Sequence, residues 1–267
     1  MKRFLAPLSL LTITIWGNMP QYDSQPPLPP KPKERDYYFY IKVDSGISFS
    51  ESAKVVAPSA TWSPAIQGYN SKLGNCPIAG FSVGCELFHA LDLEASISYR
   101  STFNYRKFQT STIGDGSYTR KFDLSVTPIL FSANLLGRGI PYLHGNVGRG
   151  KIYPILGAGL GVSHLRITNF RTTGLPPTGG SAPDASFSAE NQYTLRKNFT
   201  YTLLAGLEYS YKNYWAIGSG YRWFNAGHFK GPRYLRVASG SAVDVDGDQW
   251  KMRFRANEWF IEFKIFI

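Results

Sequence analysis

The stretch Trp259–Ile267 reads WFIEFKIFI and alternates strictly between two kinds of position. One set of positions is wholly apolar, and the other set contains Glu262 and Lys264. Successive side chains of a β-strand point to opposite faces of its sheet. The period of two therefore predicts a strand with one apolar face and one partly charged face.

The same alternation recurs in seven further stretches of the chain. They are Tyr38–Phe49, Phe81–Leu87, Leu93–Arg100, Tyr118–Leu135, Pro154–Val162, Phe199–Tyr209 and Tyr214–Phe224. Within Tyr118–Leu135 the period is lost at Pro128, where we expect a bulge or a strand end because proline has no backbone N–H to donate. The pattern predicts an all-β protein of about eight strands.

The connections between these strands alternate between long and short. The long ones are Ser50–Ile78, Ser101–Ser117, Arg166–Lys197 and Asn225–Arg255, and the short ones are Phe88–Leu91 and Lys212–Asn213. Outer-membrane barrels have short periplasmic turns and long external loops. Gly137–Gly150 is the exception, because it is longer than a periplasmic turn should be.

Charge decides which face of the strands meets lipid, because a charged side chain in hydrocarbon costs several kcal/mol. We predict that the charged residues of the alternating stretches form a network in the lumen, made of Lys42, Asp44, Glu86, Glu94, Arg100, Glu208, Arg222, Glu262 and Lys264. The lipid-facing set is predicted to include Leu93, Ile97, Leu203, Leu207, Ile261, Phe263 and Ile265. A soluble ligand carrier with its apolar face inward has the same period and remains an alternative.

Three stretches resemble the superfamily of opacity-type and OmpA-transmembrane-type small outer-membrane β-barrels. They are the glycine-rich Tyr153–Val162, Gly218–Trp223 and the terminal Glu258–Ile267. The resemblance covers Tyr38 to Ile267 and implies an eight-stranded antiparallel up-and-down transmembrane β-barrel with long external loops. It also implies that the outer-membrane assembly machinery recognises the C-terminal strand. Members of the family end in an aromatic residue, whereas here Ile267 follows Phe266.

The N-terminal part of the chain has the features of an export signal. Lys2 and Arg3 precede the apolar run Phe4–Trp16, which is shorter than the roughly 20 residues of a spanning helix. We predict a signal peptide over residues 1–17, with an uncleaved anchor as the alternative. Residues 18–36 are predicted to be a proline-rich periplasmic tail, and residues 37–267 the outer-membrane barrel.

Residues that could carry catalysis or bind a metal do not form a recognisable site. Cys76 and Cys85 would lie about 30 Å apart on one strand at ~3.3 Å per residue, too far for a disulfide unless Cys76 curls back. Adjacent residues such as Ser163 and His164 point to opposite faces of a strand. Asp244, Asp246 and Asp248 resemble the start of a calcium loop, but Arg255 stands where such a loop has glutamate. We predict no cofactor and no enzyme activity, with these aspartates as a weak calcium candidate.

The chain is strongly basic, with a formal net charge of +11, or +9 once Lys2 and Arg3 are subtracted. Many cations fall in the predicted external loops or at their rims: Arg100, Arg106, Lys107, Arg120, Lys121, Arg166, Arg171, Arg196, Lys197, Lys230, Arg233, Arg236, Lys251, Arg253 and Arg255. Such a rim would attract the phosphates of lipopolysaccharide or acidic host polysaccharides, although cations also simply keep loops solvated. Export argues against nucleic acid as a partner.

The predicted function is that of a surface barrel of structural or adhesion type with a lumen filled by side chains. An eight-stranded barrel is just wide enough for its interior side chains to fill it. The expected partners are outer-membrane lipids and lipopolysaccharide, the assembly machinery and host surface polyanions. A narrow porin-like channel is the first alternative, and a lipid-modifying outer-membrane enzyme is the second.

Overall fold

The structure is a computed structural model that describes residues 37–51, 53–56, 70–110, 117–175, 185–187, 193–237, 242–244, 249 and 251–267. The chain divides into two compact units, Met1–Glu34 and Arg35–Ile267. The predicted signal peptide and proline-rich tail lie outside the described residues, so both remain predictions. No helix in the described part is long and apolar enough to cross a membrane.

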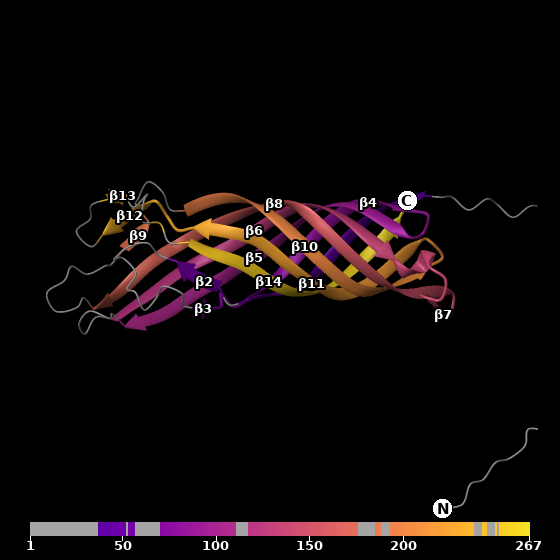
Figure 1. Ribbon diagram of the computed structural model, residues 1–267, viewed down its shortest axis with the longest axis horizontal. Helices are drawn as coiled ribbons and strands as arrows, with labels where there is room; N and C mark the ends of the chain where they lie inside the picture. Colours follow the sequence, from indigo (N-terminus) through magenta and orange to yellow (C-terminus); the bar gives the residue numbers. More distant parts are fainter. Residues whose placement is uncertain are drawn as a thin grey trace, which may run out of the picture. The chain divides into compact units, whose positions relative to one another are not determined.

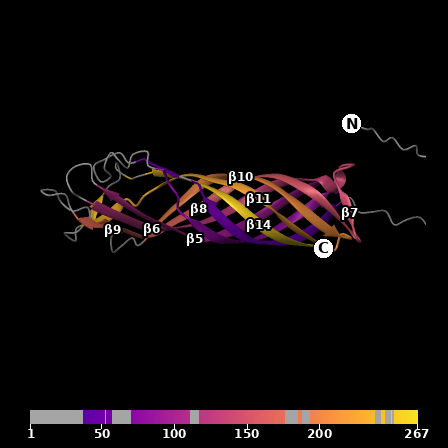
Figure 2. The same ribbon diagram turned by 90° about the horizontal axis from the view of Figure 1, so that it is seen from below.

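The second unit is a closed barrel of eight long antiparallel strands, which confirms the predicted fold class. The strands are β1 (Tyr37–Ser50), β4 (Asn75–Leu87), β5 (Leu91–Thr110), β6 (Ser117–Leu136), β8 (Gly150–Leu175), β10 (Tyr193–Tyr211), β11 (Trp215–Lys230) and β14 (Lys251–Phe266). Each pairs with the next along the chain, and β14 closes the barrel on β1. Figures 1 and 2 show these strands winding around one axis.

Short elements distinguish the two ends of the barrel. The loop end carries β9 (Ala185–Phe187), β12 (Tyr234–Val237) and β13 (Ala242–Asp244), as Figure 1 shows, and β2 (Ala53–Val56) and β3 (Asn70–Ser71) follow the end of β1 that points toward it. The turn end carries the C-terminus, β7 (Gly145–Val147) and the 3₁₀ turn η2 (Gly137–Gly139).

Two tight turns join strands at the turn end through residues in the left-handed region. Phe88 and His89 have φ values of 52° and 57°, and Lys212 and Asn213 have φ values of 45° and 59°. Two consecutive residues with positive φ produce a turn whose twist matches that of the flanking strands. The predicted short connections are therefore hairpin turns.

The strands extend well beyond the predicted boundaries at the loop end. Segments that we expected to be loops continue as strand: Ser101–Thr110 in β5, Arg166–Leu175 in β8, Tyr193–Lys197 in β10 and Asn225–Lys230 in β11. The sequence pattern does not reveal these extensions, because the apolar residues move from the outer face to the inner face within each strand.

In the half of the barrel next to the turn end, the outer face is apolar. The seven residues predicted to face lipid all lie on it, with exposed fractions between 41% and 61%. Other apolar side chains join them in a continuous outer band, among them Phe131, Leu156 and Leu160. We call this surface the apolar band.

In the half next to the loop end, the polarity is reversed. Apolar and aromatic side chains fill the interior as one buried cluster, which we call the outer core: Leu73, Cys76, Phe103, Tyr105, Phe122, Leu124, Val126, Leu165, Ile167, Phe170, Phe224, Ala226, Phe229, Met252, Phe254 and Ala256. The expectation that the apolar side of every strand points outward is wrong for this half. Water surrounds a strand that has left the bilayer, so its apolar side is buried inward as in a soluble protein.

Pro128 is neither a bulge nor a strand end, which corrects the sequence prediction. The residue is buried on the inner face of β6, and the strand continues through it. It marks the level at which the apolar residues of β6 change from inward-facing to outward-facing, from Val126 to Ile129. The bulge lies in the neighbouring strand, where the register shifts between Arg100 and Phe103.

A charge placed on the apolar band should destabilise the barrel far more than one placed above it. Arginine on the lipid face near the bilayer midplane costs about 2–4 kcal/mol and little near the interface. We therefore expect Ile261→Arg to lower the free energy of unfolding by that amount, and Ser125→Arg, on the outer face of the loop-end half, to change it little. Urea titration in lipid vesicles measures both; equal losses would contradict the placement of the band.

Candidate functional site

The candidate site is the interior of the turn-end half of the barrel. All nine charged residues predicted for the lumen lie on the inner face there, and each is buried: Lys42, Asp44, Glu86, Glu94, Arg100, Glu208, Arg222, Glu262 and Lys264. They come from six different strands, β1, β4, β5, β10, β11 and β14. Arg100, which the sequence also placed among the cations of the loop rims, is fully buried in the lumen.

Two lysines each bridge two acidic residues across the lumen. Lys42 Nζ lies 2.5 Å from Glu94 Oε2 and 3.0 Å from Glu262 Oε2. Lys264 Nζ lies 2.7 Å from Asp92 Oδ2 and 2.9 Å from Glu208 Oε2. Each ammonium group thus ties together strands that are distant in sequence and neutralises buried carboxylates.

Two tyrosines extend these ion pairs. Tyr40 donates its hydroxyl hydrogen to Glu94 Oε2 at 3.2 Å, and Tyr153 donates to Glu208 Oε1 at 2.5 Å. Both rings are buried. Each phenol group fills space beside a carboxylate and gives it one further hydrogen bond, and such additional hydrogen bonds stabilise a buried ion pair.

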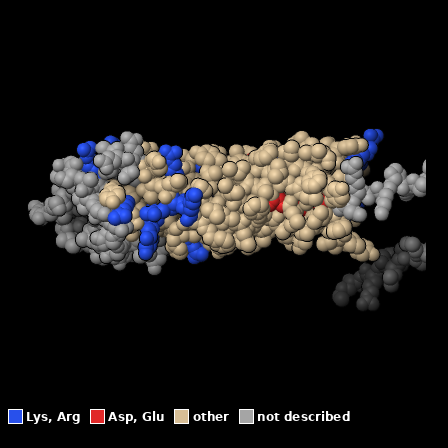
Figure 3. Space-filling view, turned by 90° about the horizontal axis from the view of Figure 1, so that it is seen from above, with Lys and Arg blue, Asp and Glu red and all other residues tan. Residues whose placement is uncertain are grey.

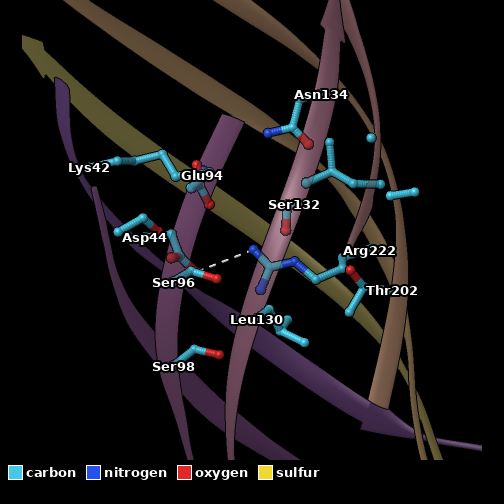
Figure 4. A pocket seen from close by; sticks show the side chains of 14 residues that line it. Lys42, Asp44, Glu94, Ser96, Ser98, Leu130, Ser132, Asn134, Thr202 and Arg222 are labelled. Carbon is cyan, nitrogen blue, oxygen red and sulfur yellow. Dashed lines mark hydrogen bonds and ion pairs between the residues drawn. The ribbon is translucent and has the colours of Figure 1, made fainter. Parts of the chain in front are cut away.

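A pair of arginines shares one glutamate next to the outer core. Arg100 donates two hydrogen bonds to Glu258, at 2.6 and 2.9 Å. Arg222 lies 3.6 Å from the same carboxylate and 3.4 Å from Asp44, toward which it extends in Figure 4. The Arg100 guanidinium also stacks over the Phe224 ring, 3.9 Å from its centroid. This stacking connects the charged network of the lumen to the outer core.

The turn end is tied across its mouth by Arg138. This residue belongs to η2, within the connection that the sequence marked as too long for a periplasmic turn. Its guanidinium lies 3.4 Å from Glu86 Oε1, donates to Ser210 Oγ at 3.3 Å and also donates to Asn213. His89 Nδ1 approaches the same Glu86 oxygen at 3.0 Å. The long connection therefore supplies a cation that closes the lumen.

Sequence reasoning missed several members of this network. Asp92 and Glu258 occupy inner positions of the same period as Glu94 and Glu262, so extending the alternation by one step would have found them. Arg138 lies in an irregular connection, where no period could reveal it.

A small cavity remains among these side chains. It has a volume of about 20 Å³ and is lined by charged and hydroxyl side chains of β1, β4, β5, β6, β10 and β11, several of which Figure 4 labels. A water molecule needs about 10–15 Å³ measured in this way. The space therefore suits one or two ordered waters, and it is too small for a solute.

The structure does not bring together the candidates for other chemistry. Ser163 faces the lumen, where its hydroxyl oxygen accepts a hydrogen bond from Thr200 at 2.6 Å, whereas the next residue, His164, faces outward. Cys76 and Cys85 are both free and lie on the same strand, β4.

The calcium candidate falls largely outside the described residues. Asp246 and Asp248 are not described, and Asp244 ends β13. Among the residues that are described, no group of three or more acidic, histidine or cysteine side chains could hold a metal ion.

Lys and Arg side chains gather at the loop end of the outer surface. Figure 3 shows them there, while the middle of the face it displays is almost free of them. An outer band of apolar side chains, an ionic lumen and basic residues beyond the band form one pattern. The chain is an outer-membrane-type β-barrel. The apolar band suits hydrocarbon because the charged residues of the lumen network are buried on the opposite, inner face.

Comparison with solved structures finds proteins of low sequence identity that match over most of both chains. Neisserial surface protein A is 14% identical to this chain, with a TM-score of 0.42. The match covers 85% of this chain and 96% of that protein. The outer-membrane protease OmpT from Escherichia coli is 8% identical, with a TM-score of 0.41, and the match covers 88% of this chain and 99% of that protein. Ail of Yersinia pestis, solved with the heparin analogue sucrose octasulfate, is 11% identical, with a TM-score of 0.29. That match covers 83% of this chain and 98% of Ail.

Comparison of the sequence with family models and with curated proteins finds no match.

Glu258 should be the most sensitive residue of the lumen, because two guanidinium groups depend on its carboxylate. Removing one partner of a buried pair typically costs about 3–5 kcal/mol, so we expect Glu258→Gln to lower the free energy of unfolding by about that amount. Arg100→Met should cost less, because Arg222 remains near the carboxylate. Urea titration in lipid vesicles, followed by gel mobility of unheated samples, measures these changes.

The matched control is Glu51→Gln. Glu51 is only partly buried and lies 3.9 Å from Arg255. It also accepts a hydrogen bond from Trp223 Nε1 at 2.9 Å, which the side-chain oxygen of glutamine can accept as well. Exposed pairs contribute about 0–1 kcal/mol, so this variant should remain close to the unsubstituted protein. If Arg100→Met proved more damaging than Glu258→Gln, the shared-carboxylate arrangement would be wrong.

Proposed function

We propose that this protein is a non-conducting surface barrel of the outer membrane, of structural or adhesion type. The observation that carries the proposal is that its interior is filled over its length by two consecutive layers of side chains. The ionic network fills the turn-end half, and the outer core fills the loop-end half. A barrel without an open passage performs its task on its outer surface and loops.

The two layers differ in chemistry, so a solute would have to disrupt both. In the ionic layer, oppositely charged groups lie within about 4 Å of one another on facing strands. In the outer core, Phe103 and Phe254 meet edge to face with ring centroids 5.0 Å apart. Close-packed protein interiors leave few voids larger than a water molecule.

The loop-end half supports a surface role because it continues the barrel beyond the apolar band. Its strands are paired, and its interior is packed, so it raises the loop end above the bilayer on a stiff support. Cations on its outer face make polyanions the expected class of partner, including lipopolysaccharide and host surface polyanions. The C-terminal strand β14, with its exposed apolar outer face, is the segment that we expect the assembly machinery to recognise.

Planar bilayer recording tests the proposal directly. We expect the purified protein to give no steady conductance steps. Replacing Lys42, Glu94 and Arg222 by serine should still give none, because the outer core remains. Adding Phe103→Ser and Phe254→Ser should then produce steps. Steady large conductance from the unsubstituted protein would overturn the proposal in favour of a channel, and gel mobility before and after boiling checks that each variant is folded.

Surface labelling tests the location and orientation. Asn104 lies exposed on the outer face of the loop-end half. We expect Asn104→Cys to react on intact cells with a maleimide that does not cross membranes. The unsubstituted protein is the control, because Cys76 is buried and Cys85 lies at the turn-end half. Labelling only after cell lysis would show that the loop end faces the periplasm.

A further inference from the structure

Three basic side chains lie side by side on the outer face of the loop-end half. Arg106 of β5 is directly opposite Lys121 of β6, and Lys121 is directly opposite Arg171 of β8. All three are exposed. Residues directly opposite each other in antiparallel strands share one face, with Cβ atoms about 4.5–5.5 Å apart. We call these three residues the cationic row.

Like charges in this arrangement repel one another and destabilise the sheet. In the part of the chain that the structure describes, none of the three residues has an ion pair with a carboxylate. Among the described residues, Asp123 lies on the same face two residues from Lys121, and its Oδ2 accepts a hydrogen bond from Asn169 at 2.6 Å. Binding of an anion would relieve this repulsion.

The cationic row continues across two further strands. Arg171 is opposite Ser186 of β9, and Ser186 is opposite Arg236 of β12. With ~4.8 Å between strands, the distance from Arg106 to Arg236 is about 19 Å. A surface of this length suits a chain of several anionic groups better than a single ion.

The rings behind the cationic row hold it in place. Tyr105, Phe122 and Phe170 are chain neighbours of the three cations and point inward, into the outer core. Tyr105 stacks on Phe122 with centroids 4.6 Å apart, and Phe122 on Phe170 at 6.4 Å. Because the backbone beneath the cations is fixed by this packing, a ligand would lose little free energy in ordering it.

The height of the cationic row argues against the headgroups of the surrounding lipid. Lys121 lies eight residues along β6 from Ile129, an outward-facing residue of the apolar band. At ~3.3 Å per residue and a strand tilt of about 40°, the row stands roughly 20 Å above that residue. Arg255 and Lys197 lie closer to the band and are better placed to meet headgroup phosphates.

The outward-facing neighbours of the row indicate the kind of polyanion. Of the described aromatic residues around the row, Tyr105, Phe122 and Phe170 point inward, and the exposed Tyr193 ring already has the Arg166 guanidinium over one face, 4.8 Å from its centroid. This arrangement offers little for a nucleic-acid base to stack on. Asn104 and Asn169 lie exposed on the outer face and offer amides that can hydrogen-bond to sugar hydroxyls. Guanidinium groups form paired hydrogen bonds with the oxygens of sulfate or phosphate groups.

We propose that Arg106, Lys121 and Arg171 form a binding site for a sulfated or phosphorylated polysaccharide that approaches the loop end from outside the cell. The inference rests on the proposed function, since the loop end must face outward for the site to be reached. The sequence predicts polyanion binding by basic residues of all the external loops, whereas the proposed site lies on the outer face of β5, β6 and β8.

Binding to the protein in nanodiscs of zwitterionic phosphatidylcholine tests the site. The probe is short-chain dextran sulfate, with unsulfated dextran of the same length as the control, followed by isothermal calorimetry at low and at moderate salt. We expect the triple variant Arg106→Gln, Lys121→Gln, Arg171→Gln to bind at least tenfold more weakly. The affinity of the unsubstituted protein should fall with added salt, because salt screens exposed charges.

A matched variant removes the same charge from the other end of the barrel. Arg149, Lys151 and Lys212 are exposed near the turn end, and their replacement by Gln should change the affinity less than twofold. Equal losses in both triple variants would overturn the site, because binding would then reflect net charge alone. Preferential binding to lipopolysaccharide micelles, or equal binding to polyglutamate, would overturn the assignment to an external polysaccharide.

Resistance to urea is a second measurement, and it distinguishes loss of the binding site from misfolding of the variant. Without polyanion, the cationic-row variant should be at least as resistant to urea as the unsubstituted protein, because its like charges no longer face one another. A marked loss of resistance would show a structural role instead. Nanodisc binding does not depend on whether the lumen conducts or which end faces outward, so failure of this site is distinguishable from failure of the proposed function.

Discussion

The barrel depends on keeping its charged side chains away from hydrocarbon. Across the apolar band the outer face must be apolar, so the charged residues of the strands at that level have to lie inside. Once inside, these groups are out of reach of bulk water and are stable only if they neutralise one another. The paired contacts of Lys42, Lys264 and Glu258 are the solution in this chain, and the closed order of strands follows from it, since an open edge would admit lipid to the interior.

The reversal of polarity along each strand follows from the same constraint. Above the bilayer the outer face meets water, so charge is tolerated outside and apolar residues return to the interior. β6 makes this change without a bulge. Its apolar residues occupy inward-facing positions before Pro128 and outward-facing positions after it. β5 makes it with a bulge after Arg100, which turns Phe103 and Tyr105 inward and Arg106 outward. The two strands show two ways of meeting one physical requirement.

The sequence predicts the strands where one rule holds over their length. β14 and β1 keep their charged side inward through most of their residues, so the period identifies them and places Glu262 and Lys42 in the lumen. The rule fails where polarity reverses, which is why the loop-end halves of β5 and β8 were assigned to loops. Pairings such as that of Lys264 with Asp92 depend on barrel closure, which brings strands distant in sequence together. Alternation within single strands cannot report such pairings.

The meeting of the two layers supports the proposal that the lumen does not conduct. Arg100 and Arg222 lie at the junction, where each guanidinium binds a carboxylate on one side and stacks on a ring on the other, Phe224 and Phe260 respectively. A planar cation satisfies both environments at once, through charge and through its π-face. Moving either group to admit a solute would expose a buried carboxylate and open the aromatic packing together. Under the proposed function, the interior serves stability, and recognition takes place on the outer surface at the loop end.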